Sequence, residues 1–388
     1  MTAFVKIEGK VQDYLWGGHD FIPNTLQSKT IDRTKPSAEY WLGTHPAAPS
    51  ITSTTKVALD QFLYQQSSPT LQFLFKVLDV KEMLSIQSHP TKEQAIAGFE
   101  KENALGIDLK ANNRNYKDKN DKPELMLALS EFWLLHGLRP IKSIQGELSR
   151  YKFLDPLKAI LESEGLIAAF AVALNDNDHQ VASMCVQLAE HVTNNASKFR
   201  RNDIEFWIQQ WVKTHPGVHK GLLTLFFFNL VKLDEGQAIY QPAGLLHAYL
   251  EGQNIELMAN SDNVLRAGLT PKHIDVKELL NTCTLSTSDP ERYLIQTNKQ
   301  PDGSMAYPTP FTEFQLDELD SKDSHVFDWE SKTPEVVFCY RGEITLTHKV
   351  QSLTLRQGQS ALILPKNLIH ATLTSARVFR AKNLASES

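Results

Sequence analysis

The segment YQPAGLLHAYLEGQNIELMANSDNVLRAGLTPKHID, residues Tyr240–Asp275, decides the fold that the sequence predicts. Pro242 and Gly244 suit a tight turn, and His247 follows that turn at the start of an expected strand. With Gly236 upstream, the order of residues is G-x5-P-x-G-x2-H. A turn that aims a histidine from a strand into the mouth of a barrel predicts a metal ligand, although a core histidine with satisfied nitrogens is the structural alternative.

The same order of residues returns near the end of the chain, as Gly358, Pro365, Asn367 and His370. Asn367 takes the place of Gly244, and asparagine is the other residue that tolerates positive φ. The five-residue step from proline to histidine is kept. This spacing is similar to the second motif of cupin barrels, and its repetition predicts two related β-barrels in one chain.

Length and composition set limits on the class of protein. A chain of 388 residues is too long for one ordinary core, so two or three domains are expected. The net charge of −5 and the pI of about 6.2 argue against a nucleic-acid or membrane-surface partner. No apolar run approaches the ~18 residues that span a bilayer, and no leader pattern opens the chain.

The three cysteines, Cys185, Cys283 and Cys339, are odd in number, far apart and without a CxxC pair. They predict neither a disulfide framework nor a thiolate zinc site. We therefore expect a cytoplasmic protein.

The spacing of apolar residues changes along the chain. Short apolar runs bounded by turn residues predict strands over residues 1–90, and apolar residues three and four apart predict helices from about Pro140 to Lys220. Strand character returns at 224–233 and continues from about residue 285 to the end. We expect a mainly β protein with a helical insert, formed by two jelly-roll barrels plus an all-α domain. The expected division is a catalytic barrel from 1–140 and 223–284, a helical insert at 141–222, and a degenerate C-terminal jelly roll at 285–388. The polar segment 102–124 is expected to be a long functional loop, such as a lid.

Four side chains are candidates for one metal site. Gln87 and His89 are two residues apart on an expected strand and would share a face, whereas a solvated strand end is the alternative. Lys122 and Glu124 flank Pro123 and would present an ammonium beside a carboxylate, with a surface ion pair as the alternative. Zinc would receive two imidazoles, a carboxylate and an amide oxygen, and would act as a Lewis acid. The four candidates are Gln87, His89, Glu124 and His247.

Five strings in order, AEYWLGTHP (38–46), MLSIQSHP (83–90), NYKDKNDKPE (115–124), QPAGLLHAY (241–249) and SDNVLRAGLTPKHID (261–275), resemble the signatures of the class I mannose-6-phosphate isomerases. The resemblance runs from Tyr14 to about Asp275, and the C-terminal part matches more loosely. It implies a zinc-dependent interconversion of mannose 6-phosphate and fructose 6-phosphate, with one Zn²⁺ per chain. It also implies that Gln87, His89, Glu124 and His247 are the zinc ligands and that Arg266 is the catalytic arginine.

That reaction moves a proton between C1 and C2 through an enediol. Arg266 keeps its charge and suits stabilisation of the intermediate, while the proton carrier is a group with a tunable pKa. The candidates are Lys122, Glu256 and Asp262 or a water on the metal, and the sequence does not choose among them. Lys122 is the first choice, with pairing to phosphate or a carboxylate as its alternative role.

Substrate binding is assigned to a further group of side chains. Ser85 and Lys272, together with Arg266, would bind the phosphate, and Glu39 would bind sugar hydroxyls. Ser85 has turn capping as its alternative, and Trp16, which matches a family position near the pocket, is expected to pack in the core.

Two features limit the resemblance. Family members commonly carry histidine before the lysine of KPE, whereas this chain carries Asp121, which is expected to be a solvated loop residue. His370 has no Gln-x-His or Lys-Pro-Glu partner nearby, and His136 is a lone histidine near apolar strands. We therefore expect His136 to be structural and the second barrel to hold no metal.

The sequence is compatible with three function classes. The leading one is the phosphosugar isomerase, acting on a small-molecule phosphosugar as a monomer, with other oligomers not excluded. The second is a non-catalytic cupin that binds a phosphosugar, and the third is a metal-dependent hydrolase or dioxygenase on the same barrel. Bound iron would favour the third, and binding without turnover would favour the second.

Overall fold

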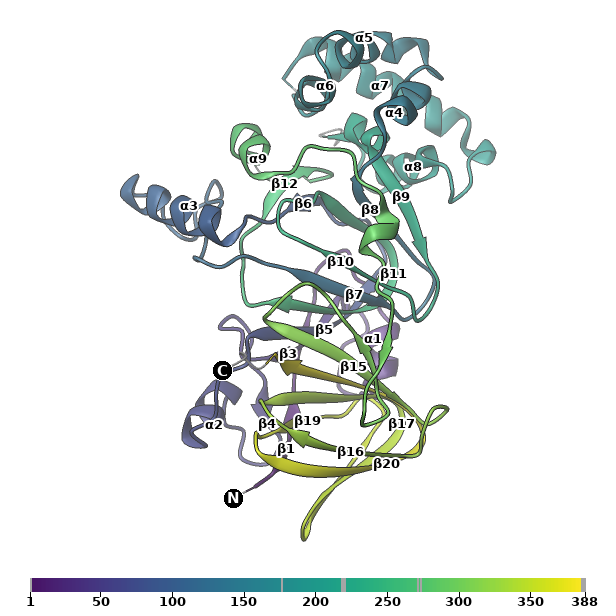
Figure 1. The fold of residues 1–388 in the computed structure, drawn as a ribbon. Helices are drawn as coiled ribbons and strands as arrows, with labels where there is room; N and C mark the ends of the chain where they lie inside the picture. Colours follow the sequence, from purple (N-terminus) through teal and green to yellow (C-terminus); the bar gives the residue numbers. More distant parts are fainter. Residues whose placement is uncertain (1, 176, 218–220, 271, 273, 385–388) are drawn as a thin grey trace.

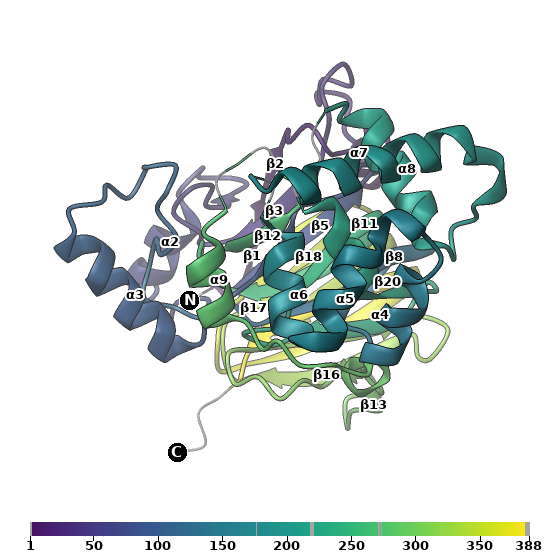
Figure 2. The ribbon, with the colours of Figure 1, turned by 90° about the horizontal axis from the view of Figure 1, so that it is seen from above.

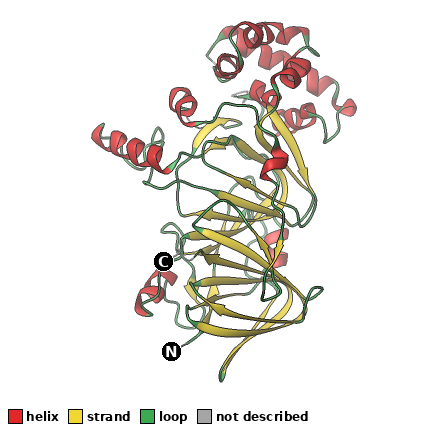
Figure 3. Ribbon diagram, viewed as in Figure 1, coloured by secondary structure: helices red, strands yellow, loops and turns green. Residues whose placement is uncertain are grey.

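The structure is a computed structural model that describes residues 2–175, 177–217, 221–270, 272 and 274–384. It is mainly β. Two ten-stranded sheets are stacked, and most of the helices lie beyond the outer side of one of them (Figures 1 and 3). The expected mainly β fold with added helices is confirmed at this level.

We call the sheet nearer the helices sheet I and the other sheet II. The central path of sheet I runs β10-β7-β11-β5-β3-β2, and four further strands attach to it. Its strands are β2 (Lys10–Gln12), β3 (Glu39–Gly43), β5 (Phe73–Val80), β6 (Ile86–Ser88), β7 (Glu124–Ala128), β8 (Phe132–Leu138), β9 (Phe228–Leu233), β10 (Ala238–Gln241), β11 (His247–Ala259) and β12 (Leu265–Gly268).

Sheet II follows the order β13-β14-β15-β20-β17-β19-β1-β4, with β16 on β20 and β18 on β17. Its strands are β1 (Phe4–Glu8), β4 (Ile51–Thr52), β13 (Asn298–Lys299), β14 (Met305–Tyr307), β15 (Phe314–Asp320), β16 (Val326–Ser331), β17 (Glu335–His348), β18 (Gln351–Arg356), β19 (Ser360–Ile363) and β20 (Asn367–Asn383).

The helices fall into a continuous group and a few isolated members. Viewed from above, α4–α8 form a layer over the strands of sheet I, while α3 projects to one side (Figure 2). The α-helices are α1 (Phe21–Thr25), α2 (Leu59–Gln65), α3 (Lys92–Ala104), α4 (Ile141–Leu148), α5 (Asp155–Ser163), α6 (Leu166–Ala173), α7 (His179–Asn194), α8 (Ile204–Thr214) and α9 (Val276–Thr282). The 3-10 helices are η1 (Lys152–Leu154), η2 (Ala196–Lys198), η3 (Leu222–Phe227) and η4 (Pro290–Tyr293). No helix among these described segments is long and apolar enough to cross a bilayer.

Local sequence explains where several helices begin. Asp178 accepts hydrogen bonds from the backbone N–H groups of Gln180 and Val181 at the start of α7. Thr91 and Gln94 form a capping box at the start of α3. Such caps satisfy backbone donors that the first helical turn leaves free.

The long strand β11 joins the two halves of sheet I. Its first residues pair with β6 and β8, and its residues from Gly252 onward pair with β5 and β7. Gly252 has φ +136°, and a Cβ there would lie 2.7 Å from the carbonyl oxygen of Glu131. Only glycine can occupy this position, where β11 changes its pairing partners, because any Cβ would clash there. The strand therefore carries His247 to one part of the sheet and Glu256 to another.

The two sheets pack back to back through an aromatic and aliphatic core. Phe75 of β5 and Phe338 of β17 have ring centroids 5.7 Å apart, and Tyr40 lies 6.3 Å from Phe338. Side chains alternate along a strand, so Lys76 of β5 points to the opposite face. The charged faces of the two sheets therefore point away from the shared core.

The structure departs from the expected elements at several places. β1 pairs with β19 and β4, so Phe4–Glu8 join sheet II and not the strands that carry the candidate ligands. The start of the strand expected at 224–233 is the 3-10 helix η3, because six successive buried residues pack against the helices. The helices α3 and α9 were not predicted.

The turn before β20 also differs from the expected one. Positive φ falls on Lys366, at +63°, and not on Asn367, which instead donates from its side-chain amide to the carbonyl oxygens of Leu364 and Pro365. Gly244 has φ +79°, as the first turn required.

Candidate functional site

Three candidate ligands meet at one end of sheet I. His89 follows β6, Glu124 begins β7 and His247 begins β11. Nε2 of His89 lies 3.3 Å from Oε1 of Glu124, and Nε2 of His247 lies 3.2 Å from Oε2 of the same carboxylate. Each residue offers a ligand atom within 4.8 Å of the others, and all three are buried. Within the described part of the chain, this is the group of histidine, cysteine and acidic side chains that could hold a metal.

The donor set fits a metal ion better than it fits a closed hydrogen-bond network. Nε2 of His89 and Oε2 of Glu124 are shielded from solvent and make no well-aligned hydrogen bond, although charged neighbours lie close. Buried polar atoms without partners are costly. An ion bound between two imidazoles and a carboxylate would satisfy them, and this donor set suits zinc.

The backbone orients both imidazoles. Nδ1 of His89 lies 2.7 Å from the carbonyl oxygen of Asn263, and Nδ1 of His247 lies 3.1 Å from that of Leu245. A histidine that donates from Nδ1 to a carbonyl presents Nε2 as the ligand atom. Burial, then Lys122, lowers the pKa of His89 to about 4, which favours the neutral form that a metal needs.

Gln87 and Lys122, which the sequence also predicted to be site residues, lie at the same end of sheet I. Nε2 of Gln87 lies 3.4 Å from Nε2 of His247, and the two residues are paired across β6 and β11. A half-turn of the amide would present its oxygen to the same space. Nζ of Lys122 lies 2.9 Å from Oε1 of Glu124. Burial opposes ionisation of Glu124, but Lys122 and His89 outweigh it and hold the pKa of Glu124 well below its usual range.

A second buried group of charges lies on the same face of sheet I. Nζ of Lys76 lies 3.0 Å from Glu256 and 3.5 Å from Glu39. Burial would lower the pKa of Lys76, but Glu256 and Glu39 outweigh it and raise that pKa. Tyr249 donates to the other oxygen of Glu256, and Trp41 donates to Glu39. Two predicted residues, Glu39 and Glu256, are thus linked through a lysine.

Lys76 was not predicted from the sequence. Its signal is a single charged residue inside the apolar run LQFLFKVLDV, where a lysine is costly unless it is paired. The structure supplies the two partner carboxylates.

Asp262, Asp121 and Ser85 lie at the edges of this region. Asp262 is half exposed, and its Oδ1 lies 3.5 Å from Nε2 of His45, whose hydrogen bond lowers the pKa of Asp262. Asp121 is half-buried. Ser85 immediately precedes β6. Among the described residues, no hydrogen bond or ion pair joins its side chain to Arg266 or Lys272.

A basic cavity of about 500 Å³ adjoins β12. Its lining includes five cationic side chains and no carboxylate, namely Lys110, Arg114, Lys117, Arg266 and Lys272. Arg266, then burial and Lys117, lowers the pKa of Lys272, and burial lowers the pKa of Arg266. Arg114 is paired with Glu102 at 2.9 Å. The like charges that crowd together around Arg266 and Lys272 favour an anionic ligand. Arg266 and Lys272 were predicted to act together, and the structure adds Lys117.

Asn263 links this cavity to the candidate metal ligands. Its side-chain oxygen accepts hydrogen bonds from the backbone N–H groups of Lys117 and Asp118, and its amide donates to the carbonyl oxygens of Asp118 and Asn120. Its own carbonyl oxygen contacts His89. Asn263 is fully buried, and through these hydrogen bonds it fixes the loop 105–123 relative to His89.

Three other residues singled out in the sequence are not part of the candidate ligand group. His136 is fully buried beside His247 in the sheet, and its Nε2 contacts the carbonyl oxygen of Tyr240. His370 is exposed and pairs with Asp328. Trp16 packs against a buried cluster of sheet I.

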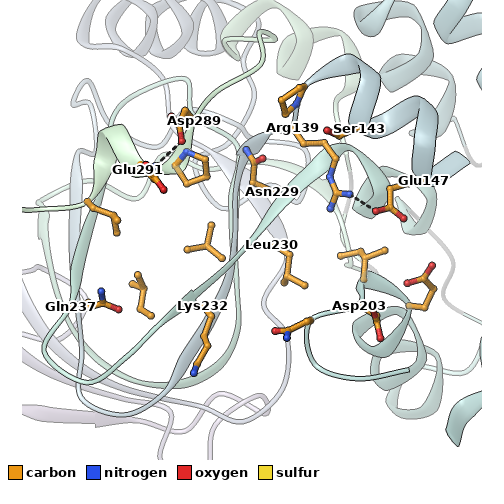
Figure 4. Close-up of a pocket in the computed structure, with 18 of the residues that line it drawn as sticks. Arg139, Ser143, Glu147, Asp203, Asn229, Leu230, Lys232, Gln237, Asp289 and Glu291 are labelled. Atoms are coloured by element: carbon orange, nitrogen blue, oxygen red, sulfur yellow. Dashed lines mark hydrogen bonds and ion pairs between the residues drawn. The ribbon is translucent and has the colours of Figure 1, made fainter. Parts of the chain in front are cut away.

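A cavity of about 700 Å³ lies between the helices and β9 (Figure 4). Its Arg139 points to Glu147 at 3.0 Å, and Asn229 and Lys232 also line it. It contains none of the predicted ligands. Volume alone therefore does not locate the chemistry.

The chain is similar to known proteins over most of its length. Residues 4–141 match the family model described as phosphomannose isomerase type I, catalytic domain. The chain is 33% identical over 378 residues to mannose-6-phosphate isomerase of Escherichia coli (strain K12), a match that covers 92% of this chain and 94% of the relative. It is 29% identical over 420 residues to mannose-6-phosphate isomerase 1 of Arabidopsis thaliana, covering 97% and 93%.

The fold is also similar to solved structures. A crystal structure of mannose 6-phosphate isomerase bound with zinc and yttrium superposes with a TM-score of 0.88 at 30% identity, covering 99% of this chain and 100% of that one. The apo form from Salmonella typhimurium gives a TM-score of 0.87 at 31% identity, with the same coverage.

Proposed function

The chain belongs to the type I phosphomannose isomerases, and from this premise we propose that the metal ligands, the charges around Lys76 and the basic cavity form one active site. It is a zinc-dependent aldose–ketose isomerase that interconverts mannose 6-phosphate and fructose 6-phosphate. The observation that carries this conclusion is the buried group His89, Glu124 and His247, with ligand atoms that lack hydrogen-bond partners. It favours an isomerase over a barrel that only binds a sugar.

We assign the metal to Gln87, His89, Glu124 and His247. Zinc held there would polarise the sugar oxygens and offset negative charge that develops on them. Gln87 contributes through its amide oxygen, and the histidines through Nε2. Their Nδ1 atoms are already directed at backbone carbonyls, which supports this assignment.

We assign the phosphate to the basic cavity. Lys272 and Lys117 would supply charge to the phosphate oxygens. Arg266 lines the same cavity and its backbone pairs with Gln87, which supports a place for it near both the phosphate and the metal. From that position its guanidinium stabilises the enediol charge. Ser85 remains a candidate hydroxyl donor to the phosphate.

The proton carrier is assigned to Lys122 as first choice, since its ammonium lies beside the ligand carboxylate Glu124. Glu256 and Asp262 are the alternatives. Glu256 already binds Lys76 and Tyr249, which suits it to hold sugar hydroxyls together with Glu39. Asp262 is more exposed and sits beside His45.

We further propose that each sheet closes into a jelly roll, with the all-α domain at 141–222 and the second barrel at 285–388. The first barrel is formed by 1–140 and 223–284, apart from β1 and β4, which belong to sheet II. Because every candidate site residue comes from one chain, the monomer suffices for activity. Cys283 and Cys339 are free thiols, which supports a reducing cytoplasm.

Metal removal tests the proposed function. Treatment with a chelator is expected to abolish formation of fructose 6-phosphate from mannose 6-phosphate in a coupled assay, and Zn²⁺ is expected to restore it. The variant His89→Ala serves as the matched control, because zinc should not restore its activity. A folded, zinc-loaded wild-type protein that turns over no mannose 6-phosphate would refute the proposal.

A further inference from the structure

The C-terminal barrel holds a second cavity lined by charged side chains. It has a volume of about 340 Å³, within the range of ~300–1,000 Å³ that is usual for small-molecule sites. It lies on sheet II, on the face turned away from the core shared by the two sheets. Its lining includes three carboxyl groups and three cations, namely Asp302, Glu330, Glu335, Lys332, Arg380 and Lys382.

The side chains of this cavity repeat the arrangement around Lys76. In sheet I, Lys76 is paired across the strands with Glu256, and in sheet II, Arg380 is paired across the strands with Asp317. Each pair is also an ion pair, at 3.0 Å for Lys76 and 2.7 Å for Arg380. Each cation lies over an indole ring, with Trp41 at 5.2 Å and Trp329 at 4.5 Å.

The indoles extend the parallel. Trp41 donates to Glu39, and Trp329 donates to Glu335 at 2.8 Å. In both sheets, a buried cation, a tryptophan and carboxylates therefore lie on the face that is turned away from the shared core. In sheet I these groups lie beside the proposed sugar site.

One group in the cavity has an unused hydrogen-bond donor, and a second is a buried carboxyl group. Arg380 is 1% exposed, and its Nη1 has no hydrogen-bond partner among the described residues. Glu335 is buried, and that burial raises its pKa to about 7 despite the opposing charge of Arg380. A buried guanidinium nitrogen without a partner is costly, whereas Glu335 already accepts a hydrogen bond from Trp329.

The charges of the lining select the class of ligand. Arg380 already binds Asp302 and Asp317, and Lys382 also binds Asp317 at 2.7 Å. An anion would have to compete with these carboxylates, in contrast to the basic cavity near Arg266. Sugar hydroxyls both donate and accept, so they match a lining of mixed sign, and an indole suits the apolar face of a sugar ring.

We propose that this cavity is a second binding site, specific for an uncharged monosaccharide, in which Trp329, Glu335 and Arg380 contact the sugar. It is separate from the active site and does not depend on the proposed catalytic roles. The second barrel is then a binding module and not only a structural one.

The test is ¹⁹F NMR of the full-length, zinc-loaded protein labelled with 5-fluorotryptophan. Trp329→Phe identifies the Trp329 resonance. Mannose, fructose and inorganic phosphate are titrated separately. We expect mannose or fructose to shift the Trp329 resonance saturably and phosphate to leave it unchanged. A shift by phosphate alone, or no shift by either sugar, would overturn the proposal.

Variants separate this site from the active site. Glu335→Gln is expected to weaken binding of the sugar about tenfold, which is the loss expected for one buried hydrogen bond. Glu330→Gln, at an exposed position of the lining, is a second variant should Glu335→Gln fail to fold. Lys322→Ala, in the exposed turn after β15, is the matched control and should bind normally. The shift should persist in Arg266→Ala, and its loss there would place the sugar in the active site and refute the proposal.

Discussion

At the residue scale, backbone geometry and short spacings orient the side chains of the proposed metal site. His247 follows a turn that requires Gly244 at positive φ, and Gln87 and His89 are close in sequence to one another. Lys76 was missed because its partners Glu39 and Glu256 lie on other strands. Pairing partners so distant in sequence leave no local pattern.

At the residue scale, Arg266→Ala is expected to lower kcat/KM for mannose 6-phosphate by about 10²–10³-fold, the usual cost of removing one preorganised charge donor. Zinc content, measured by elemental analysis, should stay at the wild-type level because Arg266 offers no ligand atom. Arg292→Ala, an exposed arginine, is the control. Near-normal turnover in Arg266→Ala would refute its catalytic role.

Glu335 gives a pH dependence of stability. Its pKa in the folded protein is raised to about 7 from the usual 4.5, so the folded state binds the proton more tightly than the unfolded state does. The unfolding free energy therefore decreases as pH rises from about 4.5 to about 7. Glu335→Gln should remove this component, and denaturant unfolding at pH 5 and pH 8 measures it. Parallel pH profiles for the variant and the wild type would contradict this assignment.

At the element scale, the loop 105–123 depends on its internal and external hydrogen bonds. Arg114 donates to the carbonyl oxygens of Ile107 and Tyr116, and Glu102 accepts from the backbone of Asn115 and Tyr116. The sequence predicted a long loop there, but not that Asn263 would hold it. That contact links segments about 145 residues apart.

Asn263→Ala should release this loop. Several buried backbone groups would lose partners, each at about 1–3 kcal/mol. We expect weaker zinc retention against a chromophoric chelator and a higher KM for mannose 6-phosphate. Asn113→Ala, at an exposed position of the same loop, should change neither quantity. Wild-type zinc retention and KM in Asn263→Ala would show that the loop is held without it.

The bend of β11 gives a second prediction at this scale. Gly252→Ala places a methyl group against the backbone of Glu131 at a φ of +136°, and should destabilise folding by about 1–3 kcal/mol or more. Gly146→Ala lies in α4 with open space around it and should be neutral or stabilising by up to about 1 kcal/mol. Denaturant unfolding measures both. Equal stabilities would mean that β11 does not require glycine at its bend.

At the scale of the whole molecule, the two sheets share one core and should unfold together. Phe338 is fully buried between Phe75 and Tyr40, so Phe338→Ala should cost about 3–5 kcal/mol. We expect loss of activity and of sheet structure at the same denaturant concentration. Val350→Ala, at a fully exposed turn of the same sheet, is the control. Two separate transitions in Phe338→Ala would show that the sheets unfold independently.

The sequence predicted the class of fold, the order of the main segments and the three candidate ligands His89, Glu124 and His247 that meet in the structure. Turn residues, apolar periodicity and short motifs are local properties, and local properties can be recognised from the sequence alone. Only the tertiary structure decided that β1 joins sheet II, that Lys76 links Glu39 to Glu256, and that Asn263 ties the loop 105–123 to His89. Each of these depends on strand pairing or burial between distant segments, and the energy of such contacts arises only after the chain has brought them together.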